Sequence, residues 1–403
     1  MPGPVNARPQ ARLEPLESSG DEVRICLRIG SGTRIANYAC RDAPLDRNPD
    51  AGFAAALPIA MASASTLDVP RGVSRRLLDA SGGIQRLLAA WDPALTPVEV
   101  RRGDGGPIPV AEAPARGTAA FFTGGVDSFY TVLTRREELD ALIYVHGFDL
   151  PLEDERKREL VSASIRGVAA EFGLPLIEVE TDLRSVSDDV CGWELIYTSA
   201  ALASVGHLLA SRFGRILIPA THSYRDLHPI GTHPLLDPLY SSERLGFEHV
   251  DSVRRVDKLE YLVESELAMS ALRVCFQPDV RALNCGRCPK CVRTMVGLRV
   301  IGALGRCSTL PSEFSLRRMS KGKVRSRQSL TYVRENLEAV EARGTDPDLA
   351  FALTRLIARG ARGEARAETT RLGVAARRSA GARMPLLRRA RRAAHRLRRL
   401  RRR

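Results

Sequence analysis

Four short apolar runs alternate with segments of helical pattern in the middle of this 403-residue chain. The runs lie at 118–123, 141–148, 174–181 and 215–223. They read as nearly continuous apolar stretches, which is typical of strands covered on both faces. Strands that alternate with helices of about 10 to 20 residues pair in parallel through right-handed crossovers. The pattern therefore predicts an α/β fold with a doubly wound, mostly parallel sheet.

The segments on either side of this core differ in texture. Residues 1–20 are rich in Pro, Glu and Ser and are expected to be disordered. Residues 21–110 predict a small N-terminal α+β domain, and residues 311–360 predict a helical extension after a main domain at 117–310. Within the N-terminal domain we expect strands at 22–30, 57–65 and 97–102 and a helix at 73–91.

The net charge of +14 lies entirely in the C-terminal tail, because residues 371–403 contain 14 arginines and no Asp, Glu or Lys. The basic character therefore says nothing about the folded body. The tail could contact nucleic acid or an acidic membrane surface weakly, through phosphates, or it could be a disordered basic tail. We expect no transmembrane helix and no secretory signal, and hence a cytoplasmic protein.

The sequence FFTGGVDSFYTVL, at 121–133, joins the first apolar run to its helix. Two glycines let the backbone approach a phosphate closely, and the N-terminus of the following helix is a ready anion site. Asp127 could cap the helix and also meet a magnesium ion bound to phosphates. A lone glycine pair could also be only a strand-to-helix turn with a capping aspartate. The candidate ligand-binding residues are Thr123, Gly124, Gly125, Val126, Asp127 and Ser128.

This segment resembles the PP-loop, the Ser-Gly-Gly-x-Asp-Ser signature of ATP pyrophosphatases in the adenine nucleotide α-hydrolase superfamily. Thr123 stands in place of the usual first serine and keeps its hydroxyl. The resemblance implies that the chain binds ATP with Mg²⁺, transfers AMP to an oxygen of a substrate and releases pyrophosphate. It also implies that the loop holds the pyrophosphate portion, and that Val145, His146 and Gly147 lie near the adenine or ribose.

Four of the eight cysteines fall within 17 residues, as C-x9-C-x2-C-x2-C. Cys275, Cys285, Cys288 and Cys291 offer the four sulfurs that structural Zn²⁺ prefers. An iron–sulfur cluster is the competing interpretation, and a group of free thiols is the third. The run CGRCPKC also resembles the zinc site of the 7-cyano-7-deazaguanine synthase branch of the PP-loop enzymes. We carry over the fold, ATP and zinc from this branch, but not its substrate.

A long irregular segment follows the fourth run and is expected to face the nucleotide. The candidates in it for substrate contact or proton transfer are His222, Asp226, His228, His233 and Asp237. Each could instead stabilise a turn. We expect Asp127, Ser128, His222, Asp226 and Asp237 to form the catalytic set. Arg287, Lys290 and Arg293, beside the cysteines, could reach an anionic group or be solvated.

Together these features predict an ATP-dependent, AMP-forming ligase or synthase that adenylates a carboxyl or amide oxygen of a small molecule. A nucleophile would then displace AMP. Three alternatives stay open: an RNA-modifying enzyme that acts on tRNA, an adenylation-dependent epimerase, and a non-catalytic nucleotide-binding module. The expected cofactors are ATP, Mg²⁺ and Zn²⁺. The expected partner is a small-molecule substrate, and a homodimer is left open.

Overall fold

A computed structural model describes residues 9–103, 114–277, 282–320, 324 and 327–360. The predictions for residues 1–8 and for the arginine tail lie outside these residues. The chain divides into two compact units, Met1–Phe314 and Ser315–Arg403. No helix in the described ranges is both long enough and apolar enough to cross a membrane.

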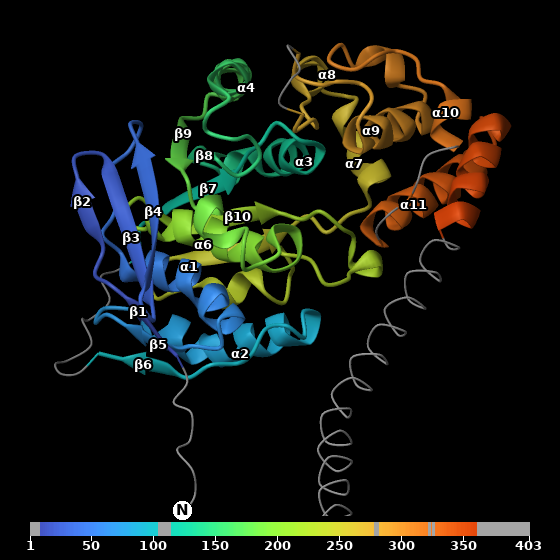
Figure 1. Ribbon diagram of the computed structural model, residues 1–403. Coiled ribbons are helices and arrows are strands. Elements are labelled where there is room, and N and C mark those ends of the chain that lie inside the picture. The colour runs from blue at the N-terminus through green and yellow to red at the C-terminus, as the bar shows by residue number, and fades with distance from the viewer. Residues whose placement is uncertain (1–8, 104–113, 278–281, 321–323, 325–326, 361–403) are drawn as a thin grey trace, which may run out of the picture. The chain divides into compact units, whose positions relative to one another are not determined.

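One 11-stranded sheet runs through the first unit, in the order β11-β10-β7-β8-β9-β4-β3-β1-β5-β6, with β2 paired to β3 (Figure 1). The strands are β1 (Gln10–Leu13), β2 (Glu17–Ser19), β3 (Glu22–Ile29), β4 (Gly32–Cys40), β5 (Thr66–Val69), β6 (Val100–Arg102), β7 (Gly117–Phe121), β8 (Ala141–His146), β9 (Leu176–Thr181), β10 (Phe213–Pro219) and β11 (Gly246–Val250). Six of the ten pairings between these strands are parallel. The predicted mostly parallel α/β sheet is confirmed.

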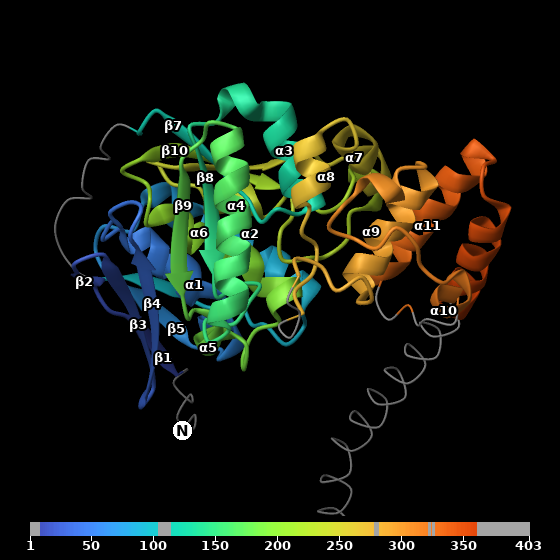
Figure 2. The same cartoon turned by 90° about the horizontal axis from the view of Figure 1, so that it is seen from above.

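Helices cover both faces of the parallel strands (Figure 2). Those of the first unit are α1 (Pro49–Ala62), α2 (Arg75–Trp91), α3 (Val126–Arg135), α4 (Glu155–Glu171), α5 (Arg184–Ser187), α6 (Thr198–His207), α7 (Arg255–Leu262), α8 (Glu266–Ala271) and α9 (Pro289–Val300). Ala119 and Phe121 of β7 belong to the core shared with α1 and α6. Ala120 belongs to the core shared with α3 and α4 on the other face. This period of two explains why the strand reads as continuously apolar.

The N-terminal strands extend the same sheet. β4 pairs antiparallel with β9, in a register that aligns Tyr38 with Thr181 and Cys40 with Val179. Residues 10–13 and 17–19, expected to be disordered, form β1 and β2 because both strands pair with β3. The boundary expected near residue 110 therefore falls between two parts of one sheet.

The segment 57–65 was expected to be a strand, but most of it lies in helix α1. Asn48 caps this helix by accepting a hydrogen bond from the backbone N–H of Asp50, and Pro49 occupies its first turn. Residues 50–61 are buried on all sides of the helix. An all-round apolar helix has no amphipathic period, so its pattern is the same as that of a buried strand.

Strand β11 follows the long irregular segment and was missed from the sequence. It is five residues long and carries a glycine and a glutamate, so it lacks a strong strand pattern. It pairs in parallel with β10 at the end of the sheet order.

The second unit contains α10 (Leu316–Ser320), α11 (Arg327–Arg343) and a further helical run at 347–360. Apolar side chains from all three segments are buried, among them Met319, Leu330 and Leu353.

Candidate functional site

The glycine loop joins the end of β7 to the start of α3. Gly124 has φ +71°, in the left-handed region that side chains rarely adopt, and Gly125 is the N-cap of α3. The hydroxyl of Ser128 organises the turn. It accepts hydrogen bonds from the backbone N–H groups of Thr123 (3.2 Å) and Gly125 (3.1 Å), and it can donate to the Gly125 carbonyl (3.2 Å). Val126 is buried beneath the loop.

Two cations from α7 hold the carboxylate of Asp127. Lys258 Nζ lies 3.1 Å from one oxygen and Arg255 Nη1 lies 3.1 Å from the other. The Lys258 side chain is fully buried, while that of Asp127 is 22% exposed. Burial raises the pKa of Asp127, but Lys258 and Arg255 outweigh burial and lower the pKa below its ordinary value. Asp127 is therefore ionised at neutral pH.

Lys258 and Arg255 were missed in the sequence. They lie three residues apart, a spacing that places both on one face of α7. Lys258 Nζ also donates to the carbonyl of Ala220, just beyond β10. The charge pattern of residues 255–262 gave no sign that this face meets a loop about 130 residues earlier in the chain.

Arg273, also missed, contacts the glycine loop through both its backbone and its side chain. Its backbone N–H donates to the Gly124 carbonyl (2.8 Å), and its Nη1 donates to the Thr123 carbonyl (3.2 Å). Its side chain is 1% exposed and lies 3.7 Å from the Asp149 carboxylate.

His222 interacts electrostatically with Asp127 of the glycine loop. Its ring packs edge-on against His228, with centroids 4.4 Å apart. Burial and His228 lower the pKa of His222 to about 3, although Asp127 acts in the opposite direction. The imidazole is therefore neutral at pH 7.

The two predicted catalytic acids of the 222–237 segment have structural partners. Asp226 accepts a hydrogen bond from the Ser223 hydroxyl (2.7 Å) within its own turn, the 3₁₀ helix η3 (Tyr224–Asp226). Asp237, in η4 (Asp237–Tyr240), is fully buried. Its carboxylate contacts His249 Nδ1 (2.7 Å), the Ser199 hydroxyl and the His233 N–H (3.1 Å). Asp237 thus connects β11, α6 and the long segment.

The end of β8 carries the three residues expected near the adenine or ribose. Val145 is in the core. His146 Nε2 lies 2.6 Å from the buried carboxylate of Glu178 on β9. Gly147 has φ +94°, and a Cβ atom there would lie 1.9 Å from the Thr181 carbonyl oxygen. The approach of the β9 backbone therefore requires glycine at this position.

The four clustered cysteines come together at the N-terminus of α9. Their four sulfur atoms all lie within 4.8 Å of one another. The Cys285–Cys291 and Cys275–Cys288 sulfurs are 3.8 and 3.9 Å apart. A zinc tetrathiolate with bonds of about 2.3 Å has sulfurs about 3.8 Å apart, so this set fits a tetrahedral metal ion. We call the described residues 275–277 and 282–291, which carry the four cysteines, the knuckle.

Backbone N–H groups also point at these sulfurs. Cys285 Sγ accepts from the N–H of Arg287 (3.5 Å) and of Cys288 (3.2 Å), and Cys288 Sγ accepts from that of Cys291 (3.4 Å). Hydrogen bonds from Cys291 lower the pKa of Cys288 to about 5. Such bonds stabilise thiolates, the form in which cysteine binds metal.

Lys290, between two knuckle cysteines, lies 3.3 Å from the ring centroid of Phe276. Burial lowers the pKa of Lys290 to about 8, partly offset by the charges of Asp149 and Glu194. The knuckle therefore brings a cation near the acid that Arg273 contacts.

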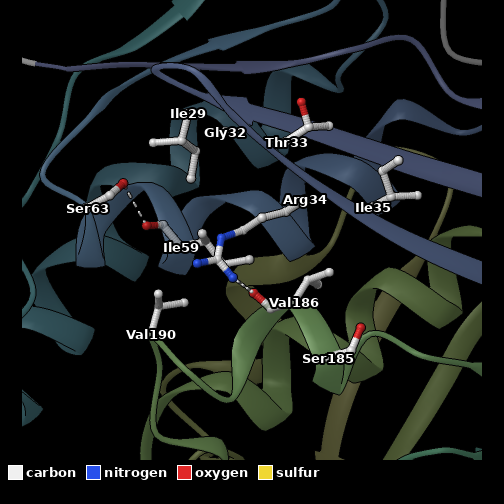
Figure 3. A pocket seen from close by; sticks show the side chains of 10 residues that line it. All are labelled: Ile29, Gly32, Thr33, Arg34, Ile35, Ile59, Ser63, Ser185, Val186 and Val190. Atoms are coloured by element: carbon white, nitrogen blue, oxygen red, sulfur yellow. Dashed lines mark hydrogen bonds between the residues drawn. The ribbon is translucent and has the colours of Figure 1, made fainter.

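A hollow with a volume of about 460 Å³ lies elsewhere (Figure 3). It is lined by β3, β4, α1 and residues 185–190, and none of the candidate site residues line it. The Arg34 guanidinium crosses it and donates to the Val186 carbonyl (2.9 Å) and to the Asp189 carboxylate (2.8 Å). This arrangement satisfies the arginine within the protein.

No protein-family model, curated protein or solved structure matches this chain. Proposals on its function therefore rest on the sequence motifs and on the geometry described above.

Proposed function

We propose that the chain is an ATP-dependent, AMP-forming enzyme of the PP-loop class. It would adenylate a carboxyl or amide oxygen of a small molecule and release pyrophosphate, after which a nucleophile would displace AMP. The observation that carries the proposal is the glycine loop at the carboxyl end of β7, beside which α7 places two cations. Ligands of open α/β sheets bind at this end of the strands.

The loop offers what a polyphosphate requires. The N-terminus of α3 presents backbone N–H groups and the positive end of a helix dipole. Lys258 and Arg255 add positive charge next to it. Phosphoryl transfer of this type needs stabilisation of charge on phosphate oxygens more than it needs a protein nucleophile.

Two metal ions fit the residues present. Asp127, which is ionised and partly exposed, is the loop carboxylate that could meet a magnesium ion brought by ATP. Magnesium would neutralise charge on the phosphates. The knuckle would hold Zn²⁺ through its four sulfurs as a structural site.

The neutral ring of His222 supports a role for this residue in contacting the substrate. Because its ring is neutral at pH 7, it can donate or accept one hydrogen bond without adding charge to a cationic site. Asp226 and Asp237 already have protein partners, so we assign them to shaping the segment that carries His222.

The test is pyrophosphate release from Mg·ATP, measured with a panel of small carboxylates and purine-like acids in the presence of ammonia. We expect AMP and pyrophosphate to appear together with one substrate. Asp127→Asn should lower the rate by about 100-fold or more. Asp79→Asn, which changes an exposed acid on α2, should leave the rate unchanged.

The same assay separates the alternatives. If ATP binds but no small substrate yields pyrophosphate, the panel is repeated with tRNA. Release with tRNA alone would favour an RNA-modifying enzyme. Failure to bind ATP at all would contradict the proposed function.

A further inference from the structure

We propose that metal occupancy of the knuckle fixes the geometry of the glycine loop through Arg273, so that the metal and Mg·ATP bind cooperatively. This inference rests on the proposed function for its nucleotide, but the mechanical link is argued from contacts within the chain.

The first step is the contact between Arg273 and the glycine loop. Arg273 donates hydrogen bonds to two successive carbonyls, those of Thr123 and Gly124. In a trans peptide the C=O and the N–H point in opposite directions, and the described residues contain no cis peptide. The N–H groups of Gly124 and Gly125 therefore point away from Arg273.

A flip of either peptide would reverse this arrangement. Gly124 has φ +71°, and glycine occupies positive and negative φ about equally readily, so no side chain of its own opposes such a change. Flipping the Thr123–Gly124 peptide would present a carbonyl oxygen, instead of the Gly124 N–H, to a bound phosphate. Flipping the next peptide would break the hydrogen bond from the Gly125 N–H to the Ser128 hydroxyl. The Arg273 contacts oppose both flips, and so they preserve the anion-binding form of the loop.

The second step ties Arg273 to the knuckle. Cys275 is two residues further along the chain. The side chain of Asn284, just before Cys285, accepts a hydrogen bond from the N–H of Val274 (2.8 Å) and donates one to the Leu272 carbonyl (2.7 Å). A metal bound to Cys275 and Cys285 would therefore close a ring around the segment that carries Arg273.

Arg273 depends on this segment for its position. Among the described residues, its buried Nε and Nη2 have no hydrogen-bond partner. In the part of the chain that the structure describes, the hydrogen-bond, ion-pair and ring contacts of the guanidinium are the Thr123 carbonyl, Asp149 at 3.7 Å and the Phe276 ring at 5.4 Å. With so few bonds of its own, the side chain will move when its backbone moves.

The charges near the knuckle favour the same coupling. Zn²⁺ with four thiolates carries a net charge of −2. Lys157, which is buried, donates to the Ala282 carbonyl in the knuckle, and Lys290 lies over Phe276. A bound metal centre, in which all four sulfurs are thiolates, therefore gives these cations and Arg273 more counter-charge than the metal-free cysteines do.

The experiment measures the affinity of full-length protein for Mg·ATP by calorimetry, with zinc bound and after zinc is removed by a chelator. Zinc removal should weaken Mg·ATP binding by about 10-fold or more, and saturating Mg·ATP should tighten zinc binding by the same factor. Circular dichroism checks that the sheet stays folded. Equal affinities for Mg·ATP with and without zinc would overturn the proposal.

Arg273→Gln provides an independent arm in zinc-loaded protein. It should weaken Mg·ATP binding about as much as zinc removal does, and removal of zinc from this variant should add less than about twofold. Arg273→Lys should recover part of the affinity. Arg215→Gln, on the surface of β10, should match the wild type. If zinc removal weakens Mg·ATP binding by the same factor in Arg273→Gln as in the wild type, the two effects are independent and the link is contradicted.

Hydrogen exchange tests the link without nucleotide. The Arg273 amide, bonded to the Gly124 carbonyl, should lose protection when zinc is removed, while amides of β7 and β8 keep theirs. If no ATP binds but this protection changes, the proposed function fails and the mechanical link stands. Unchanged Arg273 protection would overturn the link whatever ATP does.

Discussion

The knuckle and the glycine loop are built in opposite ways. The knuckle takes all four sulfurs from 17 consecutive residues, and its spacing alone predicts a metal site. The glycine loop supplies a backbone turn from 123–128, but its charged partners come from residues 255, 258 and 273. A site built from neighbouring residues is visible in a sequence, whereas a site assembled by the fold shows only its local part.

The largest expected effect tests how far the knuckle is self-contained. Cys288→Ser removes one of four ligands, and structural zinc contributes on the order of 10 kcal/mol to the folding of such segments. We expect loss of bound zinc by elemental analysis and a fall of several kcal/mol in the free energy of unfolding. Cys26→Ser, outside the cluster, should retain zinc. Full zinc content in Cys288→Ser would show that another residue completes the site.

A smaller loss of stability is expected at Gly147, where the backbones of two strands approach each other closely. Gly147→Ala places a methyl group against the Thr181 carbonyl and forces alanine to φ +94°. We expect a destabilisation of about 3 kcal/mol by denaturant unfolding. Gly167→Ala is the matched control, since it lies inside α4 with nothing within 4 Å of the new Cβ. It should stabilise the protein by up to about 1 kcal/mol. Similar results for the two variants would contradict the role of Gly147.

The smallest effect concerns the charge around the loop. His222 has a pKa of about 3 when folded, against 6.5 in the unfolded chain. Between these values the unfolded state binds more protons, so stability must fall as the pH falls. From pH 6.5 to 5 this costs up to about 2 kcal/mol. His222→Gln should flatten the pH dependence of the unfolding free energy. A slope identical to that of the wild type would mean that His222 is not a neutral buried group.

Strands β7 to β10 were predictable because their apolar residues are buried on both faces of the sheet. The runs at 118–123 and 141–148 carry that signal directly and became β7 and β8. The helical pattern between the runs at 141–148 and 174–181 became α4, in which Val161, Ile165 and Val168 are buried along one face. The four knuckle cysteines were predicted as a group, and the structure brings them together.

The parts of the fold and of the candidate site that the sequence did not predict depend on contacts between distant residues. Helix α1 is apolar all round, so no period separates it from a strand. Strands β1 and β2 gain order from β3, and their composition does not show it. The acid at 237 looked like a catalytic candidate because its partners, Ser199 and His249, lie on other elements. Lys258 and Arg273 escaped notice for the same reason.

The pairing of β4 with β9 has a consequence for synthesis on the ribosome. The two strands are roughly 140 residues apart in the chain. At a translation rate of about 5–20 residues per second, β4 waits about 7 to 30 seconds for its partner. During that time its outer edge offers unpaired N–H and C=O groups to any other chain. The nascent protein is therefore exposed to misassembly at this edge until residue 181 leaves the exit tunnel.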